Sequence, residues 1–522
     1  MKIVSTAEMR ELDRRTIEEF GIPGELLMDR AGYGVADVAR YLARTCGFGD
    51  ALIQLFAGRG NNGGDAFVAA RYLKKMGFEV EVFFAGEASS VHGDALKQLL
   101  QMRSDGIDLR ELTTLEDWEA LQDTPQAAGD ILIDGLLGTG MTGPARGPVV
   151  GAIQVINTFA KQALVVAIDV PSGLIADTGR AEGDVVTADV TVTMGMPKRG
   201  LIEPCALGVV GNVEVIDIGI PSELTDPIQS DVELVTLEDV GRMLGRRSRT
   251  SHKGSYGHVL LIGGARGFSG AIAMNGMAAA RSGVGLVSIL APEFLVPVVA
   301  GLVPEAMVHP GQTNATGSLS GNALEGWGQN LDRFDAVLIG PGMTPHADTA
   351  TLVSQVVASG VGTIVLDADA LNVVAEDPLL LGAHRDGIIL TPHPGEMARL
   401  LQRDVTTVQA DRFATVCSAA ERFGGTVVLK GAGSLIARQR HSICVNLTGN
   451  PGMASGGMGD VLSGLMAGLA AQGFSPFDAA RAAVHIHGRA GDSVARLTSQ
   501  AGMVASDVIA EIPQVFRDMS GR

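Results

Sequence analysis

Short apolar runs alternate with helical segments along almost the whole chain, and this alternation constrains the fold more than any other feature. The runs are rich in Val, Ile and Leu without strict apolar–polar alternation, as expected of parallel strands buried on both faces. Amphipathic segments that end on glycine lie between them, for example AFVAARYLKKMG at 66–77. The repeated strand–helix order predicts doubly wound α/β sheets. The predicted strands lie at 51–58, 79–86, 130–137, 163–170, 189–195, 257–264, 285–290, 335–342, 362–369, 387–393 and 425–431.

A chain of 522 residues is too long for one ordinary hydrophobic core, so we expect more than one domain. The strand–helix rhythm breaks in the stretch around Pro221 and Pro227, where mixed charges interrupt it. We therefore predict two α/β domains, each with three αβα layers, the first at 1–222 and the second at 230–515.

Composition and charge exclude several classes of protein. The formal net charge of −18 argues against binding along a nucleic-acid backbone, which needs basic stripes. No uninterrupted apolar stretch reaches the roughly 18 residues of a membrane span, and the N-terminal residues lack the apolar core of a signal peptide. The four cysteines, Cys46, Cys205, Cys417 and Cys444, are too widely spaced for a zinc site or a disulfide framework. We expect a cytoplasmic protein that acts on small molecules, with no nucleic-acid or membrane partner.

Three loops of the first domain are rich in glycine and polar residues: GRGNNGGD at 58–65, DGLLGTGMTGP at 134–144 and IDVPSG at 168–173. Each follows a predicted strand, and ligands of open α/β sheets bind at the carboxyl ends of the strands. The first two loops contain the dinucleotide-binding pattern G-x-G-x-x-G, but two matches in a glycine-rich domain make that pattern weak evidence. A dehydrogenase would also need an acid about 20 residues after the first glycine, and Glu79 and Glu81 lie too early in their strand.

Several side chains with oxygen atoms lie where these strands end. Asn62, Asp134 and Ser172 are on three different loops, and oxygen ligands without Cys or His suit a hard cation. The alternative is that they only bond to neighbouring turns. Asp169 follows a buried strand, where a carboxylate can transfer protons. Asp65 lies where the N-cap of a helix would be, which is the alternative to a catalytic role.

Taken together, GRGNNGGDAFVAAR, DGLLGTG and IDVPSG resemble the NAD(P)H-hydrate epimerase family over most of residues 1–220. That family interconverts the R and S forms of a hydrated nicotinamide cofactor, so the resemblance implies a Rossmann-like domain that binds a dinucleotide as its substrate. It implies an acid/base role for Asp169. The implied contacts to the hydrate are Asn61, Asn62, Gly63, Gly64, Asp65, Gly138, Thr139, Gly140, Met141, Thr142, Gly143, Pro144 and Asp169, and the implied potassium ligands are Asn62, Asp134 and Ser172. Some relatives have a lysine in the second loop; this chain has Met141 and Thr142 there, so a lysine-assisted mechanism is not expected.

The segment GNPGMASGGMGDVLSG at 449–464 is the strongest signal in the second domain. Its turn, Gly456 to Gly459, leads directly into a predicted helix near Asp460, and free N–H groups at such a junction bind anions. An acid there repels phosphate but can take a proton from an attacking hydroxyl while the N–H groups stabilise the transferring phosphoryl group. The alternative for Asp460 is an N-cap. The chain has no G-x-x-x-x-G-K-[ST] motif and is therefore not a P-loop enzyme.

Four motifs between about 245 and 500 resemble the ribokinase-like fold and, within it, the ADP/ATP-dependent NAD(P)H-hydrate dehydratase family. They are SHKGSYGHVLLIGG, TPHPGEMARLL, VVLKGAGSLI and GNPGMASGGMGDVLSG. The resemblance implies that a nucleotide, preferably ADP, phosphorylates the hydrate with Mg²⁺ bridging the phosphates and that the phosphate ester then eliminates. The implied nucleotide contacts are Lys430, Gly431, Ala432, Gly433, Ser434 and Gly459, and the implied hydrate contacts are Ala271, Gly342, His393 and Asp460. It also implies a homo-oligomer, a tetramer or larger.

Other interpretations remain open. The protein could be a ribokinase-type kinase of a small alcohol with a regulatory first domain, or a nucleotide-sensing scaffold. The pairs His393–Glu396 and His485–His487 suggest metal binding only weakly, because neither has a clear third ligand. Asp369 and Asn372 in DADALN face the substrate or cap the following helix, and His252 and Lys253 steer an anion or are solvated.

Overall fold

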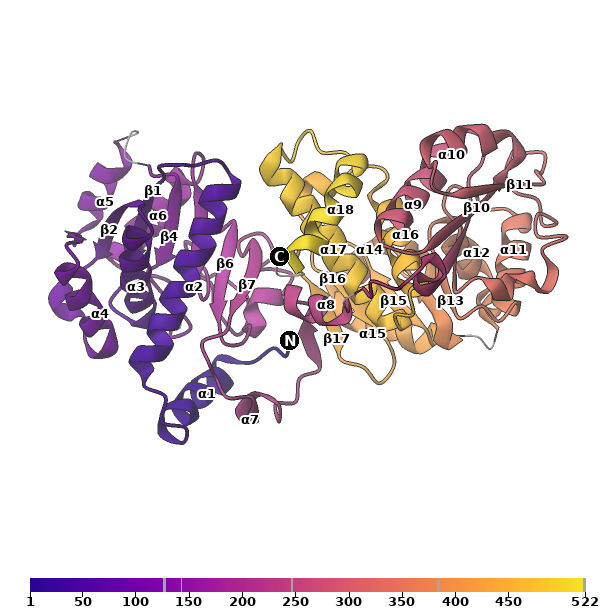
Figure 1. The fold of residues 1–522 in the computed structure, drawn as a ribbon. Coiled ribbons are helices and arrows are strands. Elements are labelled where there is room, and N and C mark those ends of the chain that lie inside the picture. Colours follow the sequence, from indigo (N-terminus) through magenta and orange to yellow (C-terminus); the bar gives the residue numbers. More distant parts are fainter. Residues whose placement is uncertain (125–127, 142, 246, 383–384, 520–522) are drawn as a thin grey trace. The chain divides into compact units, whose positions relative to one another are not determined.

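The computed structural model describes the chain except for residues 125–127, 142, 246, 383–384 and 520–522. The chain forms two compact units, Met1–Ser230 (the first unit) and Asp231–Arg522 (the second unit). Each unit is an α/β fold built on one sheet, which confirms the predicted fold class (Figure 1). Among the described residues, no helix is both long and apolar enough to cross a membrane.

The first unit contains a seven-stranded parallel sheet with the order β3-β2-β1-β4-β5-β6-β7, so the strand order reverses between β1 and β4. The strands are β1 (Leu52–Ala57), β2 (Glu79–Ala85), β3 (Leu109–Leu112), β4 (Ile131–Gly135), β5 (Leu164–Ile168), β6 (Val190–Met194) and β7 (Asn212–Ile216). The helices are α1 (Thr6–Glu18), α2 (Gly24–Thr45), α3 (Asn61–Lys75), η1 (Ala88–Ser90), α4 (Gly93–Ser104), α5 (Leu115–Gln122), α6 (Pro148–Phe159), η3 (Arg199–Ile202) and α7 (Ser222–Thr225).

Helices cover both faces of this sheet. Ile53 and Leu55 of β1 belong to a core shared with α1, α2, α3 and α4, whereas Phe56 belongs to a core shared with α5 and α6. Alternate residues of one strand thus enter opposite cores, which is why the strand sequences read as continuous apolar runs. The result is a three-layer Rossmann-like unit whose loops meet where the strand order reverses.

The second unit contains a ten-stranded sheet with the order β11-β10-β9-β12-β13-β14-β15-β16-β17-β8, in which β16 runs antiparallel to both of its neighbours. The strands are β8 (Val232–Leu234), β9 (His258–Ile262), β10 (Leu286–Pro292), β11 (Met307–Gly311), β12 (Ala336–Ile339), β13 (Thr363–Leu366), β14 (Ile388–Leu390), β15 (Thr426–Leu429), β16 (Ser434–Ala437) and β17 (Ile443–Asn446). Helices α9, α16, α17 and α18 share a core with alternate residues of these strands, and the intervening residues, such as Val337 and Ile339, are fully buried as well.

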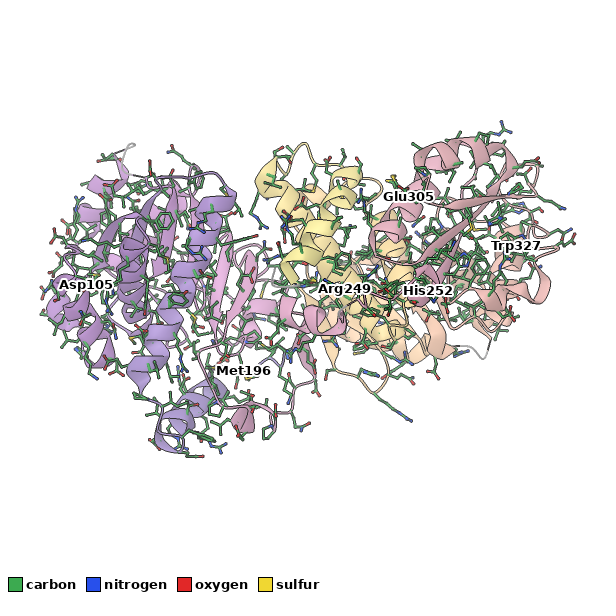
Figure 2. The ribbon with its side chains drawn as sticks, in the orientation of Figure 1. Asp105, Met196, Arg249, His252, Glu305 and Trp327 are labelled. Atoms are coloured by element: carbon green, nitrogen blue, oxygen red, sulfur yellow. The ribbon has the colours of Figure 1, made fainter. Side chains whose placement is uncertain are left out.

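The helices of the second unit are α8 (Leu237–Met243), η4 (Lys253–Tyr256), α9 (Ser269–Arg281), η5 (Glu293–Leu295), α10 (Val296–Leu302), η6 (Gly328–Arg333), α11 (Ala347–Ala358), α12 (Asp369–Glu376), η7 (Pro378–Leu381), η8 (Arg385–Gly387), α13 (Pro394–Leu401), α14 (Val405–Ala410), α15 (Arg412–Phe423), η9 (Pro451–Met453), α16 (Met458–Ala471), α17 (Pro476–Leu497) and α18 (Ala505–Met519). The basic segment at the start of this unit is a surface feature. The guanidinium of Arg247 lies 4.0 Å from the ring centre of Tyr256, and His252, labelled in Figure 2 with Arg249, is exposed and precedes η4.

All eleven predicted strands exist, but β3, β7, β8, β11, β16 and β17 were not predicted. Most of these six strands carry charged or polar residues, and β3, β7, β8 and β11 lie at or next to the edge of their sheet. Strands in such positions are only partly covered, so they lack the continuous apolar run on which the prediction depended.

Candidate active sites

In the first unit, the carboxyl ends of β1, β4 and β5 bring the three predicted loops together. The strands are in register there, with Ala57 beside Gly135 and Asp134 beside Ala167. Loop 58–65 packs very tightly: a Cβ atom added to Gly63 would lie 1.8 Å from the carbonyl oxygen of Gly58. Only glycine fits that position without moving the backbone.

Helix α3 begins at Asn61, and its N-cap is Gly60 without a side-chain cap. The N-cap alternative for Asp65 is therefore wrong, because Asp65 lies inside the helix and is only 8% exposed. Burial and the negative charge of Asp169 raise the pKa of Asp65 well above its usual range. The loop 138–144 lies near Asn62, since a Cβ on Gly138 would be 3.1 Å from Asn62 Oδ1. Thr142 of this loop lies outside the described residues.

Asn62, Asp134 and Ser172 lie together as predicted from their places at the strand ends. Ser172 donates to Asp134 through its hydroxyl (2.6 Å) and its backbone N–H (2.8 Å), and the N–H of Leu136 donates to the same carboxylate at 3.2 Å. The amide of Asn62 donates to the carbonyl oxygens of Leu137 (2.8 Å) and Ile168 (2.9 Å). The turn-bonding alternative is thus realised, and the oxygen atoms of all three side chains are gathered in one place.

The oxygen-rich cluster also fits a monovalent cation. Asp134 is fully buried, burial raises its pKa to about 6, and its neighbours are hydrogen-bond donors rather than cationic side chains. A buried carboxylate without a cation is costly, and a bound cation would offset that cost. Asn62 Oδ1 has no hydrogen-bond partner within the described part of the chain. No group of three or more His, Cys, Asp or Glu side chains suited to a metal ion occurs among the described residues, so neutral oxygens would complete this site.

Asp169 forms a buried ion pair that the sequence did not predict. The ammonium of Lys198 lies 2.5 Å from Asp169 Oδ1 and also donates to Thr193 Oγ1 (3.1 Å) and the carbonyl of Met194 (2.8 Å). Lys198 is 1% exposed. Asp169 has a φ of 65°, which non-glycine residues rarely adopt, and the ion pair helps to hold it there. A lysine therefore does reach the predicted acid/base residue, from the loop after β6 rather than from the loop 138–144.

Asp13 of α1 belongs to the same charged cluster and was also missed. Burial raises its pKa to about 6, with Lys198 opposing the rise and Asp169 adding to it. Its Oδ1 atom is buried and has no hydrogen-bond partner among the described residues. The sequence signals were weak, because Asp13 lies in a charged N-terminal helix and Lys198 in the unremarkable segment GMPKRG.

In the second unit, α16 begins at Met458 after Gly457, whose φ is 89°. Asp460 is the third residue of this helix and makes no side-chain cap, so the N-cap alternative is wrong. Burial raises the pKa of Asp460 to about 7, with Asp367 adding to the rise and Lys430 opposing it. Asn275 donates to the backbone carbonyl of Asp460 at 2.7 Å and ties the helix to α9. A carboxyl group with this pKa can accept a proton near neutral pH.

Lys430 lies at the end of β15, close to the same helix. Its ammonium donates to Asp367 Oδ1 at 2.9 Å and lies 3.8 Å from Glu396 Oε2. Although burial opposes the charge, these two carboxylates raise the pKa of Lys430. A Cβ on Gly459 would lie 3.5 Å from the Lys430 ammonium, so the two predicted nucleotide contacts are neighbours.

The loop that follows Lys430 is held by a buried arginine. Arg412 is 6% exposed and donates to the carbonyls of Leu429 (3.3 Å) and Gly433 (3.3 Å). Ser434 donates to the carbonyl of Gly431 at 2.9 Å. Arg412 was not predicted, because an arginine at the start of an amphipathic helix is usually a surface residue.

The other predicted hydrate contacts of the second unit lie in the first turn of α9 (Ala271), in the loop after β12 (Gly342) and at the N-cap of α13 (His393). A Cβ on Gly342 would lie 3.4 Å from the Cβ of Ala271, so these two residues are adjacent. His393 caps α13, its Nδ1 accepting from the N–H of Gly395 at 3.0 Å, and burial, Lys430 and Arg399 lower its pKa. His393 is therefore a neutral capping residue beside the charged cluster.

The remaining predicted polar residues have local structural roles. Asp369 accepts from the N–H of Thr344 at 2.8 Å, and Asn372 accepts from Arg399 at 2.9 Å; neither caps α12, whose N-cap is Ala368. His485 and His487 are buried in α17, and burial lowers their pKa values to about 3 and about 4. Both are neutral core residues near pH 7.

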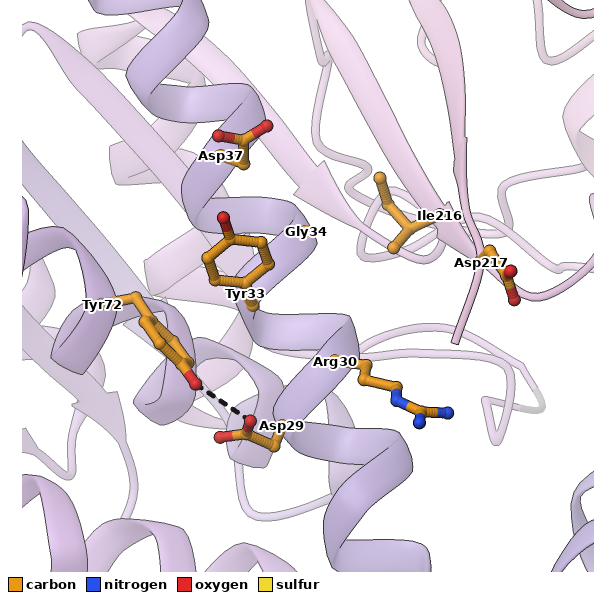
Figure 3. A pocket seen from close by; sticks show the side chains of 8 residues that line it. All are labelled: Asp29, Arg30, Tyr33, Gly34, Asp37, Tyr72, Ile216 and Asp217. Atoms are coloured by element: carbon orange, nitrogen blue, oxygen red, sulfur yellow. Dashed lines mark hydrogen bonds between the residues drawn. The ribbon is translucent and has the colours of Figure 1, made fainter. Parts of the chain in front are cut away.

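A cavity of about 490 Å³ in the first unit contains none of the predicted site residues (Figure 3). Tyr33 and Gly34 of α2, Tyr72 of α3 and Ile216 of β7 line it. The Tyr72 hydroxyl donates to Asp29 at 2.9 Å, drawn as a dashed line in Figure 3. The cavity therefore lies beside α2, and the predicted chemistry lies at the strand ends.

The comparisons with known proteins cover both units. A family model described as NAD(P)H-hydrate dehydratase matches residues 259–514, and one described as YjeF-related protein N-terminus matches residues 24–200. The bifunctional NAD(P)H-hydrate repair enzyme Nnr of Moorella thermoacetica is 38% identical, with 99% of this chain and 97% of that protein covered. The enzyme of the same name from Escherichia coli is 34% identical, with 97% and 92% covered.

Among solved structures, a ribokinase-like superfamily protein from Enterococcus faecalis is 26% identical, with 56% of this chain and 99% of that chain covered and a TM-score of 0.50. This likeness confirms the ribokinase-like fold of the second unit. The full-length matches above 30% identity cover both units in one chain. The chain belongs to the family of bifunctional NAD(P)H-hydrate repair enzymes.

Proposed function

We propose that this chain repairs hydrated NADH and NADPH with two activities on one polypeptide. The first unit interconverts the R and S forms of the hydrate. The second unit uses ADP or ATP to convert the S form back to the reduced cofactor, and with ADP the products are AMP and phosphate. Family membership and the two separate charged clusters support this assignment.

In the first unit, the substrate lies against Asn61 to Asp65 and the loop 138–144, with Asp169 as the acid/base residue. A dinucleotide at the switch point of an open α/β sheet is the usual arrangement. Asn62, Asp134 and Ser172 would hold a potassium ion. That ion would supply a positive charge beside the buried Asp134 carboxylate and would fix the strand-end loops.

In the second unit, Asp460 takes the proton from the hydroxyl group of the hydrate. The oxygen then attacks the terminal phosphorus of the nucleotide, and the bond from that phosphorus to the bridging oxygen breaks. Free N–H groups in the first turn of α16 and the ammonium of Lys430 stabilise the charge on the transferring group. In the ester, the C–O bond to phosphate breaks and the neighbouring carbon loses a proton, which restores the ring double bond.

The remaining contacts hold the two reactants. Lys430, Gly431, Ala432, Gly433, Ser434 and Gly459 bind the nucleotide, and Ala271, Gly342 and His393 bind the hydrate. A magnesium ion bound beside the phosphates would neutralise part of their charge. Asp367 and Glu396, both within 4 Å of Lys430, are the carboxylates that would hold it.

One observation supports the proposal most: a half-buried carboxyl with a pKa of about 7 lies in the first turn of a helix that follows a glycine, beside the largely buried Lys430. The test is to mix the full-length chain with both epimers of hydrated NADH and with ADP or ATP. We expect NADH absorbance to return with one of the nucleotides. Persistence of the hydrate with phosphorylation of another alcohol would identify a kinase, and binding without conversion would identify a scaffold.

Assembly into a homo-oligomer, a tetramer or larger, is part of the proposal. Exposed apolar side chains gather on η5, α10 and the edge strand β11: Phe294 (42% exposed), Val298 (47%), Leu302 (51%) and Met307 (41%). Such a patch is uncommon on a monomer and suits an interface between copies. Light scattering of the purified chain tests this, and a monomeric mass at micromolar concentration would contradict it.

A further inference from the structure

Four ionisable side chains from four elements of the first unit meet at its strand ends. Asp13 comes from α1, Asp65 from α3, Asp169 from the end of β5 and Lys198 from the loop after β6. The charges of Asp13, Asp169 and Lys198 all act on Asp65. The cluster therefore has one ammonium group for three carboxyl groups, and this ammonium forms its ion pair with Asp169.

Asp65 differs from the other acids of this region. Asp134 accepts three hydrogen bonds, and Asp169 accepts from Lys198, Thr193 and Met194. The side chain of Asp65, by contrast, is 92% buried and has no hydrogen bond or ion pair within the described part of the chain. Asn62, three residues before it in α3, donates to the carbonyl of Ile168 at 2.9 Å, so the first turns of α3 lie against the end of β5, next to Asp169.

An ionised carboxylate in such a place has little contact with water and no donor among the described residues, so burial favours the neutral acid. Asp13 adds to this effect, because its own carboxyl is largely buried and its Oδ1 atom has no partner among the described residues. The cluster thus combines Asp169, which is ion-paired with Lys198, with Asp65, whose pKa is raised by burial. Two carboxyl groups in such different surroundings are the arrangement expected of a base and an acid.

The proposed epimerisation needs such a pair. Water adds to the enamine of a dihydronicotinamide so that the hydroxyl is on the carbon next to the ring nitrogen, a hemiaminal. Inverting that carbon requires opening and closing of the ring. Opening removes a proton from the hydroxyl and delivers one to the nitrogen, so one base and one acid must act together.

We propose that Asp65 is the catalytic proton donor that acts opposite Asp169 in the epimerisation of the hydrate, with Asp13 as a positioning residue that helps to keep the proton on Asp65. The inference rests on the proposed epimerase function of the first unit. Asp169 takes the hydroxyl proton, the O–H pair forms the C=O bond, the C–N bond breaks, and the nitrogen takes the proton of Asp65. After rotation about the adjacent C–C bond, the nitrogen attacks the other face of the carbonyl, and both protons return.

The test is the variant Asp65→Asn in the full-length chain, which keeps the shape of a neutral acid but cannot give up a proton. We measure the rate at which each purified epimer of hydrated NADH converts to the mixture, with nucleotide absent. Loss of one acid–base group predicts a fall in kcat of about 10²–10⁴-fold with KM changed little. Nucleotide-dependent dehydration of the S epimer by the same variant should be unchanged, which shows that the second unit is intact, and the small change in KM shows that the first unit keeps its substrate site.

The pH profile separates a proton donor from a structural residue. An acid must be protonated to act, so wild-type epimerisation should fall on the alkaline side, and Asp65→Asn should lose that limb. Asp13→Asn should move the alkaline limb to lower pH without abolishing turnover. The matched control is Asp94→Asn on α4, a partly exposed aspartate paired with Lys97, which should behave as wild type.

Each outcome is decisive. If wild type does not interconvert the epimers, the proposed function itself fails. If wild type does so and Asp65→Asn retains its kcat and its alkaline limb, Asp65 is not the proton donor. A raised KM with unchanged kcat would likewise overturn the inference and leave Asp65 as a binding residue only.

Discussion

Replacing Lys198 by methionine leaves the Asp169 carboxylate without its ion-pair partner in a largely buried place. The pair is 2.5 Å long, with side chains 1% and 14% exposed, so solvent screens it little. Removing one member of a buried pair typically costs 3–5 kcal/mol, because the other charge stays uncompensated. Since Asp169 keeps some contact with water, we expect a loss of about 3 kcal/mol in the unfolding free energy of the first unit at pH 7.

The assay uses the position of the two tryptophans. Trp118 is fully buried in the first unit and Trp327 belongs to the second, so a Trp327→Phe background makes fluorescence report on the first unit alone. Urea unfolding in that background gives the free energy for wild type, Lys198→Met, Asp169→Asn and the double variant. The double variant should recover much of the loss, because it removes the orphaned charge.

Two results would refute this reasoning. A change below about 1 kcal/mol for Lys198→Met would mean that the pair behaves like a surface ion pair. A double variant that is less stable than either single variant would mean that packing, rather than charge, sets the cost. Because an unpaired carboxylate can take up a proton, the loss should also shrink at acid pH, and a pH-independent loss would argue against an electrostatic cause.

Three further predictions concern the remaining sites. Asp460→Asn should abolish nucleotide-dependent dehydration and leave epimerisation near normal; in wild type, dehydration should rise with pH through about 7, because Asp460 must be ionised to accept a proton. Burial raises the pKa of Asp134 to about 6, so the folded state favours the neutral acid. Ionisation of Asp134 therefore destabilises the first unit, and this loss of stability is absent at low pH and develops as the pH rises through about 6. Potassium at 100 times its Kd should offset that loss near pH 7 and raise the Tm of the first unit by about 5–10 °C, measured by differential scanning fluorimetry. Sodium should give a smaller shift, and the Asp134→Asn variant should show none. Gly63→Ala should abolish epimerisation, because its Cβ would meet the Gly58 carbonyl at 1.8 Å, whereas Gly60→Ala, with open space around it, should be nearly neutral in the same assay.

The fold was predictable because its central strands are buried on both faces. β4 and β5 read as unbroken apolar runs, and the polar loops after them could be placed at one edge of the sheet. The strands that were missed, such as β7 and β8, are short or partly covered and carry polar residues. Their pairing is set by the rest of the sheet rather than by their own sequence.

The candidate sites were predictable only where glycine-rich loops mark a strand end. Asn62, Asp134, Ser172 and Asp169 were found in this way. Lys198, Asp367 and Arg412 are buried and bind partners that are far away along the chain. The spacing of residues in one sequence reveals neither the burial nor the partner.

The N-cap alternatives failed for a local reason. Sequence position alone placed Asp65 and Asp460 at helix starts, but in both cases a preceding glycine is the N-cap and the aspartate lies within the helix. Glycine is acceptable at an N-cap, so the acid is left to face the loops instead.

The most direct test of the account follows NADH absorbance when each purified epimer of the hydrate is mixed with the full-length chain, magnesium and ADP or ATP. Wild type should restore NADH from both epimers, Asp460→Asn from neither, and Asp169→Ala from the S epimer far faster than from the R epimer. Full restoration from both epimers by Asp460→Asn, or none by wild type with either nucleotide, would contradict the assignment of the two chemistries to these two carboxylates.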